Sequence, residues 1–302
     1  MGEIDELFAW DFEASQLPMM RDRLRQRADY PAAARRLAAN MLLDADGDPA
    51  LGGMLRDAGR TVAALSAVYL DATGGLTLAR LKTFIAGFGL VSAGRARALL
   101  DLMTHHDYVR PEPGGRPRTY SLTPRFLESY RRHEASLLGA VAVVEPAAGL
   151  VERNLGAPAV MNTLAVEQGA AFVAASRLGH GLDPWYRIFM DRLAGIQLIH
   201  ELVARADTFP PTDWIAFSQA ATGRRFQVSR VHLGRMIQAG VDQGFMEVRP
   251  GAVRFTEAGQ EALHWIYTGR LCVHLASAAR TLKAHPELAA DGGLTIGRGL
   301  AI

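Results

Sequence analysis

The sequence predicts a mainly α-helical protein with small β-hairpin wings, in which one folding unit occurs twice and a helical region joins the two copies. Three observations predict this fold class. Apolar residues recur at helical spacing along most of the 302-residue chain, pairs of short strand-like segments follow two of the helices, and the stretches that contain them align at a fixed offset.

The N-terminal part is expected to be helical. Helices are expected at Met19–Arg27, Ala32–Leu43 and Pro49–Ala72. Between the last two, Asp44, Asp46 and Asp48 alternate as in a calcium-binding loop. Position 12 of such a loop would be Leu55 instead of glutamate, which favours a solvated turn that caps the next helix.

After Gly74-Gly75 the pattern changes to short elements. The expected elements are an extended pair at Leu76-Thr77, helices at Leu78–Ala86 and Ser92–His105 around a turn at 87–90, strands at Tyr108–Arg110 and Arg118–Leu122 around a Pro/Gly-rich turn, and a long helix from Thr123-Pro124.

A similar order follows in the second half of the chain. The expected elements are a helix at Pro184–Ala206, a short helix from Pro210 to Gln219, a turn at 221–223, a helix at Ser229–Gln243, strands at Phe245–Arg249 and Val253–Phe255 around Pro250-Gly251, and a long helix capped by Thr256.

The two stretches align residue by residue. At an offset of 137, Ser92 matches Ser229, and the buried stripe matches as well. That stripe is Ala96, Leu99, Leu100 and Met103 in the first stretch, and Leu233, Met236, Ile237 and Gly240 in the second. After the hairpin the offset falls to 133, because Thr123 matches Thr256, so the second hairpin is expected to be four residues shorter. Periodicity, caps and hairpins therefore agree on a duplicated unit.

This order of elements is typical of a winged helix-turn-helix. Its second helix buries one stripe, which leaves the opposite face free to enter the major groove of DNA. The expected domains are an N-terminal helical segment at 1–48, a first unit at 49–145, a helical connector at 146–183, a second unit at 184–285 and a tail at 286–302.

The hairpins also carry a family resemblance. Tyr108-Val109-Arg110 and Tyr120–Pro124 resemble the wing of MarR-type regulators, and Phe245–Arg249 with Val253–Gly259 resemble it more strongly. The resemblance covers roughly residues 54–145 and 184–285, and it implies a DNA-binding transcriptional regulator. The chain departs from the pattern by carrying two units, and neither hairpin has the acidic-x-Arg tip of such wings.

The expected DNA contacts lie on the second helix of each unit, just before it, and on the wings. They are Ser92, Arg95, Arg97, Arg110, Arg116 and Arg118 in the first unit, and Arg224, Arg225, Gln227, Ser229, Arg230, His232, Arg235, Arg249 and Arg254 in the second. We expect Arg95, Arg230 and His232 to read base edges and the wing arginines to contact phosphates. Any one of these arginines could equally be a solvated surface residue.

The charge distribution points to the same partner. Residues 76–133 hold 10 basic and 4 acidic residues, a net charge of +6, and residues 224–255 hold 6 and 2, a net charge of +4, in a chain whose total is +2. A polyanion that contacts two patches would suit this pattern. Chance is the alternative, because arginine is abundant throughout the chain.

Enzyme signatures are absent from the sequence. There is no dinucleotide-binding glycine motif, phosphate loop, Gly-x-Ser-x-Gly or His-Glu-x-x-His. The single cysteine, Cys272, excludes an intramolecular disulfide and a multi-cysteine metal site. We therefore expect no catalysis, no cofactor and no metal.

The connecting region, about 137–193, is apolar, with a break expected at Gly179-His180-Gly181. Six of its residues could line a pocket for a small apolar effector: Met161, Phe172, Trp185, Tyr186, Phe189 and Met190. Trp185 and Tyr186 are the main candidates. Ordinary packing between the two units is the alternative.

The expected function is sequence-specific binding of double-stranded DNA by a transcriptional regulator. Its two recognition helices would act as a pseudo-dimer on half-sites ~10 bp apart, or two chains would form a homodimer. The alternative is a tandem winged-helix replication initiator or chromosome-segregation scaffold. No stretch reaches the ~20 apolar residues of a membrane span, and the acidic start is unlike a signal peptide, so we expect a cytoplasmic, nucleoid-associated protein without a membrane partner.

Overall fold

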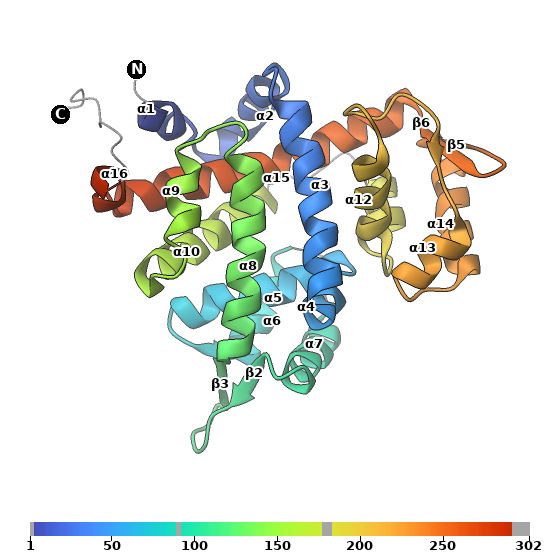
Figure 1. Cartoon of the computed structure of the whole chain (residues 1–302). Helices are drawn as coiled ribbons and strands as arrows, with labels where there is room; N and C mark the ends of the chain where they lie inside the picture. Colours follow the sequence, from blue (N-terminus) through green and yellow to red (C-terminus); the bar gives the residue numbers. More distant parts are fainter. Residues whose placement is uncertain (1–2, 89–91, 177–182, 292–302) are drawn as a thin grey trace.

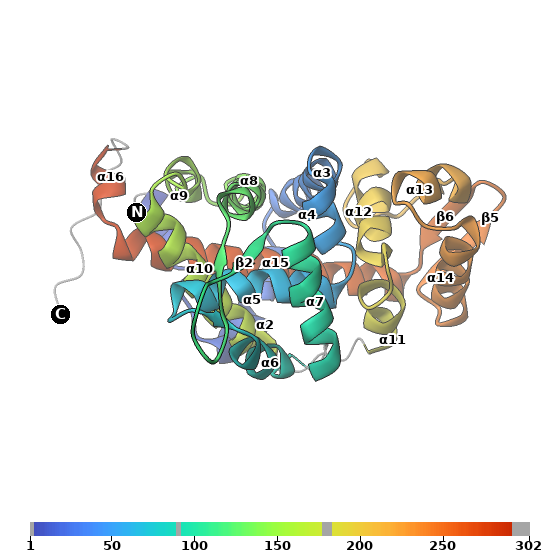
Figure 2. The same ribbon diagram turned by 90° about the horizontal axis from the view of Figure 1, so that it is seen from below.

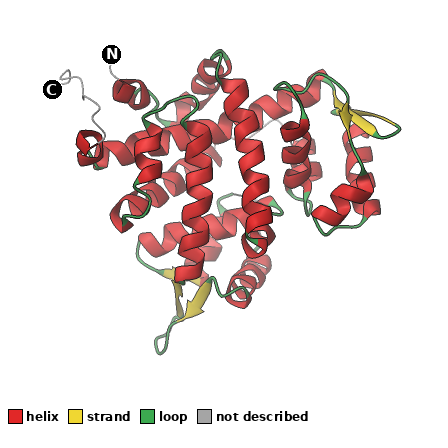
Figure 3. Cartoon of the chain, in the orientation of Figure 1, coloured by secondary structure: helices red, strands yellow, loops and turns green. Residues whose placement is uncertain are grey.

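The computed structural model describes residues 3–88, 92–176 and 183–291. It is mainly α-helical, with two small three-stranded antiparallel sheets, as Figures 1 and 3 show. This confirms the expected mixture of helices and hairpins.

The N-terminal helices are more numerous than expected, and the one at Tyr30–Gly47 is longer. They are α1 (Glu3–Phe8), η1 (Ala14–Gln16), α2 (Leu17–Arg25), α3 (Tyr30–Gly47) and α4 (Pro49–Met54). The turn expected around Asp44 and Asp46 is wrong, since α3 continues through both residues. The Asp44 carboxylate is held on α8 by the Ser136 hydroxyl at 2.7 Å and by His133 Nδ1 at 2.9 Å, which keeps this turn of α3 in place. Asp48 does cap the next helix, as expected.

The single helix expected at Pro49–Ala72 is also wrong, because it divides into α4 and α5 (Ala58–Ala72). The cause lies in Asp57, whose backbone is extended and whose carboxylate accepts a hydrogen bond from the Arg60 backbone N–H at 2.9 Å. A side-chain acceptor at this position satisfies a free N–H of a new helix and so favours a new start over continuation.

The first set of short elements follows the expected order. It comprises β1 (Leu76–Thr77), α6 (Leu78–Ala86), α7 (Ala93–His105), β2 (Val109–Pro111), β3 (Thr119–Leu122) and α8 (Pro124–Val141). The strands form an antiparallel sheet in the order β1-β3-β2, with Arg110 opposite Ser121. Thr123 caps α8 through the Phe126 backbone N–H, as expected.

Several helices connect the two sets. They are α9 (Ala148–Arg153), α10 (Pro158–Ser176), α11 (Asp183–Trp185), the π-helix η2 (Tyr186–Met190) and α12 (Gly195–Arg205). The continuous helix expected at Pro184–Ala206 is wrong, because Ala194 is left-handed at φ 63° and separates η2 from α12. The break expected at Gly179-His180-Gly181 lies outside the described residues.

The second set repeats the element order of the first. It comprises β4 (Ile215–Ala216), α13 (Gln219–Arg225), α14 (Arg230–Asp242), β5 (Met246–Arg249), β6 (Ala252–Phe255), α15 (Glu257–Ala284), and then α16 (Glu287–Asp291). The strand order β4-β6-β5 matches that of the first sheet. Helices α7 and α14 are both 13 residues long and start 137 residues apart, which confirms the offset.

One part of the second set is misplaced in the prediction. The expected helix from Pro210 to Gln219 contains strand β4, and the expected turn at 221–223 lies inside α13. The helix starts later because Ser218 is extended and its hydroxyl accepts a hydrogen bond from the Ala221 backbone N–H at 3.3 Å.

The two sets share one hydrophobic core. The long helix α15 crosses the molecule behind α3 and α8, and α3 packs between α8 and α12 (Figure 1). A single cluster of buried apolar side chains extends from Trp10 near the N-terminus through both sheets to Leu282. Within the described residues, no helix is both long and apolar enough to cross a membrane.

Candidate nucleic-acid interface

Helix α7 buries the stripe that its sequence predicts. Ala96, Leu99, Leu100 and Met103 are all buried. Ser92 caps the helix by accepting a hydrogen bond from the Arg95 backbone N–H at 3.3 Å. The opposite face, with Arg97, Ala98 and Asp101, is exposed. One face of the helix is therefore free to meet a ligand.

Helix α14 is built in the same way. Its residues Leu233, Met236, Ile237 and Gly240 are buried, and Ser229 caps it through the His232 backbone N–H at 3.0 Å. Its outer face exposes Arg230, Val231, Arg235 and Gln238. The equivalent helices thus present equivalent faces, but α14 presents more positive charge.

The three residues expected to read base edges differ in their surroundings. The Arg95 guanidinium forms an ion pair with the buried Asp57 carboxylate at 2.6 Å. His232 Nε2 lies 2.8 Å from the Leu193 carbonyl oxygen, which makes the ring nitrogen the donor. Only Arg230 is exposed with no hydrogen bond or ion pair from its guanidinium to any described residue.

The residues that precede α14 also divide into free and engaged side chains. Arg224 is exposed, whereas Arg225 is paired with Glu201 and, at 2.6 Å, with Asp46. Gln227 is exposed and has a left-handed backbone at φ 53°. Its carbonyl oxygen accepts a hydrogen bond from Arg56 at 3.1 Å, so the first half of the chain holds this turn.

The first hairpin carries three of the expected arginines. Arg110 is paired with Asp107 at 2.9 Å, and this hydrogen bond lowers the pKa of the Asp107 carboxyl. Arg116 and Arg118 lie in the exposed loop between β2 and β3. The hairpin therefore offers two unpaired cations near its tip.

The second hairpin has a feature that sequence reasoning missed. Arg249 and Arg254 both lie over the ring of Trp214, at 4.4 and 5.0 Å from its centroid, and Arg254 is also paired with Glu247. The aromatic ring holds the two guanidinium groups on one side of the hairpin. The only signal for Trp214 is its position one residue before β4, a strand that the sequence did not reveal.

The two hairpins do not lie side by side. In Figure 1, β2–β3 extends from the lower edge of the molecule and β5–β6 from the right-hand edge, and Figure 2 shows α7 and α14 separated by other helices in the view from below. The expected pseudo-dimer, in which both recognition helices enter one face of a duplex, stays a prediction.

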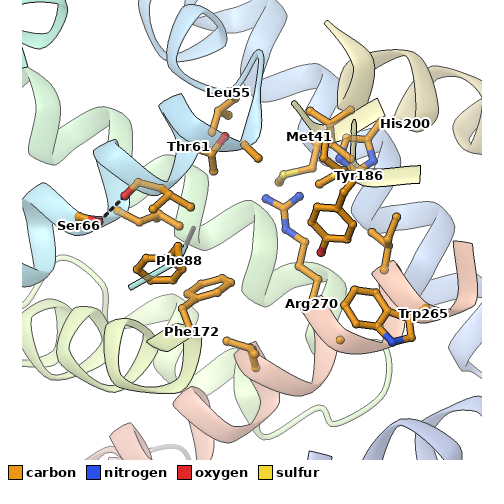
Figure 4. A pocket seen from close by; sticks show the side chains of 18 of the residues that line it. Met41, Leu55, Thr61, Ser66, Phe88, Phe172, Tyr186, His200, Trp265 and Arg270 are labelled. Carbon is orange, nitrogen blue, oxygen red and sulfur yellow. Dashed lines mark hydrogen bonds between the residues drawn. The ribbon is translucent and has the colours of Figure 1, made fainter. Parts of the chain in front are cut away.

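The two residues expected to line an effector pocket have separate environments. Trp185 is fully buried, with its ring 5.2 Å from that of Phe245 and 4.6 Å from that of Phe189, so it belongs to the core beneath the second sheet. Tyr186 lines a partly open cavity of about 250 Å³, together with Phe172 and Met190 from the expected set (Figure 4). Met161, Trp185 and Phe189 are not among its lining residues.

Neither a metal site in the described residues nor a match to a known protein indicates a ligand. Among the described residues, no group of three or more His, Cys, Asp or Glu side chains could hold a metal ion. Comparisons with protein-family models, with curated proteins and with solved structures found no match. The function is therefore inferred from the geometry of α7, α14 and the hairpins.

Proposed function

We propose that this protein is a sequence-specific transcriptional regulator that binds double-stranded DNA through two winged helix-turn-helix units. The proposal is supported by an element order that occurs twice, each time with a capped helix that buries one face and exposes the other beside a basic hairpin. The major groove of B-DNA is wide enough for such a helix.

The observation that carries the proposal is the outer face of α14. Arg230 and Arg235 are exposed there, and Arg224 is exposed at the end of α13. None of the three forms a side-chain hydrogen bond or ion pair with another described residue. Unpaired guanidinium groups on an exposed helix can bind guanine edges or phosphates with both of their nitrogen donors.

The first unit has a supporting role in this proposal. Its helix α7 has one expected base reader, Arg95, engaged by Asp57, and its outer face includes Asp101. Among its expected DNA contacts, the free cations are Arg97 on α7 and Arg116 and Arg118 on the hairpin. We infer that α14 reads sequence, while the first unit contacts the phosphates of a separate stretch of DNA.

The test uses a duplex selected by the full-length protein from random sequences. Replacing Arg230 and Arg235 together by alanine should weaken binding of that duplex by about 100-fold or more, since each base-reading arginine contributes ~1–3 kcal/mol. Random duplex should lose less affinity. Gel-shift titrations at several salt concentrations measure both effects.

A matched control removes the same charge elsewhere. Arg131→Ala with Arg153→Ala deletes two arginines from α8 and α9, away from α13 and α14 (Figure 1). Arg153 is exposed, and the side chain of Arg131 is 41% exposed and paired with Glu128. This double variant should bind the selected duplex within about threefold of wild type, because long-range charge effects are screened at physiological salt. Equal losses in the two double variants would refute a reading role for α14.

The first unit needs its own pair of substitutions. Arg97→Ala with Arg118→Ala should weaken selected and random duplexes by similar factors and reduce the slope of log affinity against log salt by about 2. A footprint separates the alternatives to regulation. Repeated direct sites at an origin would indicate replication initiation, and no protection would indicate a scaffold.

A further inference from the structure

The candidate ligand site is the partly open, mainly apolar cavity that Tyr186 lines. It lies between α2, α3, α5, α6, α10, η2, α12 and α15, and its volume is about 250 Å³. An apolar cavity of about 150 Å³ accommodates benzene. The cavity in this protein can therefore hold a substituted ring or a small bicyclic molecule.

Most of the lining is apolar. Phe88 and Phe172 lie at one side, and Tyr186 and Trp265 at another (Figure 4), and Phe84 and several aliphatic side chains complete the apolar lining. The lining residues include two arginines, Arg21 and Arg270, but no aspartate or glutamate. This combination suits a molecule with an apolar body and a negative charge.

Arg270 is the polar centre of the cavity. It lies on α15, and Figure 4 shows its guanidinium among the lining side chains, next to Tyr186. Among the described residues, it has no hydrogen bond and no carboxylate within ion-pair distance. Burial lowers the pKa of this group. An arginine nevertheless stays charged in proteins, so this half-buried cation faces the cavity without a partner that would offset the cost of its desolvation.

The nearest acids are committed to other side chains. Asp44 and Glu134 act on Arg270 electrostatically, but Asp44 is bound by His133 and Ser136, and Glu134 by Gln168. Burial also raises the pKa of Glu134, which favours its neutral form. No internal carboxylate therefore neutralises Arg270 directly.

Arg21 adds a second positive charge to the lining. Its guanidinium lies 4.0 Å from the centroid of the Trp265 ring, and its Nε is buried without a hydrogen-bond partner. The cation–π contact orients the group without removing its charge. Both cations of the cavity thus keep unused hydrogen-bonding capacity.

We propose that the cavity binds a small organic carboxylate whose aromatic or aliphatic body fills the apolar part and whose carboxylate pairs with Arg270. A carboxylate accepts two parallel hydrogen bonds from a guanidinium, which neither an amide nor an amine reproduces. This replaces the expected apolar effector by an anionic one. Ligand binding is independent of DNA; only its use as a regulatory signal rests on the proposed function.

The position of the cavity gives the ligand contact with both units. The lining residues Val62 and Phe84 come from helices of the first unit, and His200 and Arg270 come from helices of the second. A ligand that pairs with Arg270 would therefore stabilise the arrangement of the two units in which the cavity has the size and shape seen in this structure.

The first experiment compares ligands of one shape and different charge. The full-length protein is titrated calorimetrically with 2-naphthoate, with 2-naphthamide and with 2-naphthylmethylamine, and then with octanoate and octanamide. We expect at least one carboxylate to bind about 10- to 100-fold tighter than its amide, and the amine to bind weakest. Failure of both carboxylates to exceed their amides would overturn the proposal.

The second experiment tests the residue. Arg270→Met keeps the length of the side chain without its charge and should remove the preference for the carboxylate, whereas Arg270→Lys should retain part of it. The matched control, Arg131→Met at a solvent-facing position of α8, should bind as wild type. Because the change of Arg270 to methionine removes a half-buried charge without a partner, the melting temperature of the free protein should stay equal or rise.

The ligand-binding result is independent of DNA binding. A variant with wild-type melting behaviour that still prefers the carboxylate would show that Arg270 is not its partner. The titrations contain no DNA, so failure of the DNA-binding proposal would leave them unchanged, and loss of the carboxylate preference would leave the DNA-binding proposal intact.

Discussion

Asp57 makes three interactions with two helices through a single carboxylate. It caps α5 through the Arg60 backbone N–H at 2.9 Å, pairs with the Arg60 side chain at 3.2 Å, and pairs with Arg95 of α7 at 2.6 Å. Its side chain is only 5% exposed. The same group therefore starts one helix and anchors the helix that presents the exposed face of the first unit.

Two substitutions of Asp57 distinguish its role as a helix cap from its ion pairs. Asp57→Ala should lower the free energy of unfolding by about 1–2 kcal/mol, through loss of the cap and of two partly exposed ion pairs. Asp57→Asn should lose less, because asparagine is also a good N-cap. Urea denaturation followed by circular dichroism measures both values. An alanine variant as stable as wild type would contradict the anchoring role.

At the residue scale, the sequence predicts which helix faces are exposed better than it predicts which side chains lack intramolecular partners. The positions of Arg97, Arg230 and Arg235 outside the buried stripes follow from helical periodicity alone. The engagement of Arg95 does not, because its partner lies 38 residues earlier in the chain, at a helix start that the sequence pattern concealed. For the same reason the backbone partner of His232, 39 residues away, could not be predicted.

The start of α15 shows how closely the second unit is packed at the level of its elements. A Cβ atom added to Gly259 would lie 2.1 Å from the Phe245 carbonyl oxygen, which belongs to the chain just before β5. No side chain can yield there, since the neighbour is backbone. The close approach of these two elements therefore requires glycine.

This requirement predicts opposite effects at two glycines of the same unit. Gly259→Ala should destabilise the protein by at least about 1–3 kcal/mol through overpacking. Gly234→Ala on α14 faces only the flexible Gln219 side chain, at 3.2 Å, and should be neutral or stabilising by up to about 1 kcal/mol through helix propensity. Thermal melts of both variants give the comparison, and a tolerated Gly259→Ala would contradict the close packing.

At the element scale, hairpins and caps were predictable where local chemistry specifies them. Ser92, Thr123, Ser229 and Thr256 are all N-caps, as their hydroxyls at helix starts predict. Errors arose where tertiary contacts decide. Helix α3 extends past its aspartates because α8 binds Asp44, and β4 is a strand because it pairs with β6.

At the scale of the whole molecule, the two units are not independent. One apolar cluster runs through both, and Arg56, in the break between α4 and α5, donates a hydrogen bond to the carbonyl oxygen of Gln227 in the turn before α14. Periodicity describes each helix by itself and contains no information about how the two units face each other. The placement of the two hairpins at different edges of the molecule could therefore not be predicted from the sequence.

The shared core also contains buried histidines that couple stability to pH. His274 Nδ1 lies 3.0 Å from Gln168 Nε2, which donates to it, and His200 Nδ1 lies 2.7 Å from the Tyr267 hydroxyl. Burial, followed by the nearby charges of Arg270 and His133, lowers the pKa of both histidines well below the ordinary value. The folded protein therefore keeps both rings neutral at pH values where the unfolded chain protonates them.

The direction of the pH effect follows from this difference. Below about pH 6.5, the unfolded state binds protons that the folded state refuses, so the free energy of unfolding falls by up to about 1.4 kcal/mol per pH unit for each histidine. Glu134 acts in the opposite direction. Its raised pKa contributes stability that is present below about pH 4.5 and is lost as the pH rises through the folded-state value.

Burial also raises the pKa of Glu145, which acts like Glu134, and lowers the pKa of His264, which acts like the other two histidines. Because the three histidines outnumber the two glutamates, we expect a net loss of stability in mild acid. Urea unfolding should yield a lower free energy at pH 5.5 than at pH 7.0, and His274→Gln, which stays neutral at both pH values, should show a clearly smaller decrease than wild type. His105→Gln, at the exposed end of α7, is the control and should keep the full decrease. If His274→Gln lost as much stability as wild type between the two pH values, protonation of the buried network would not be the cause.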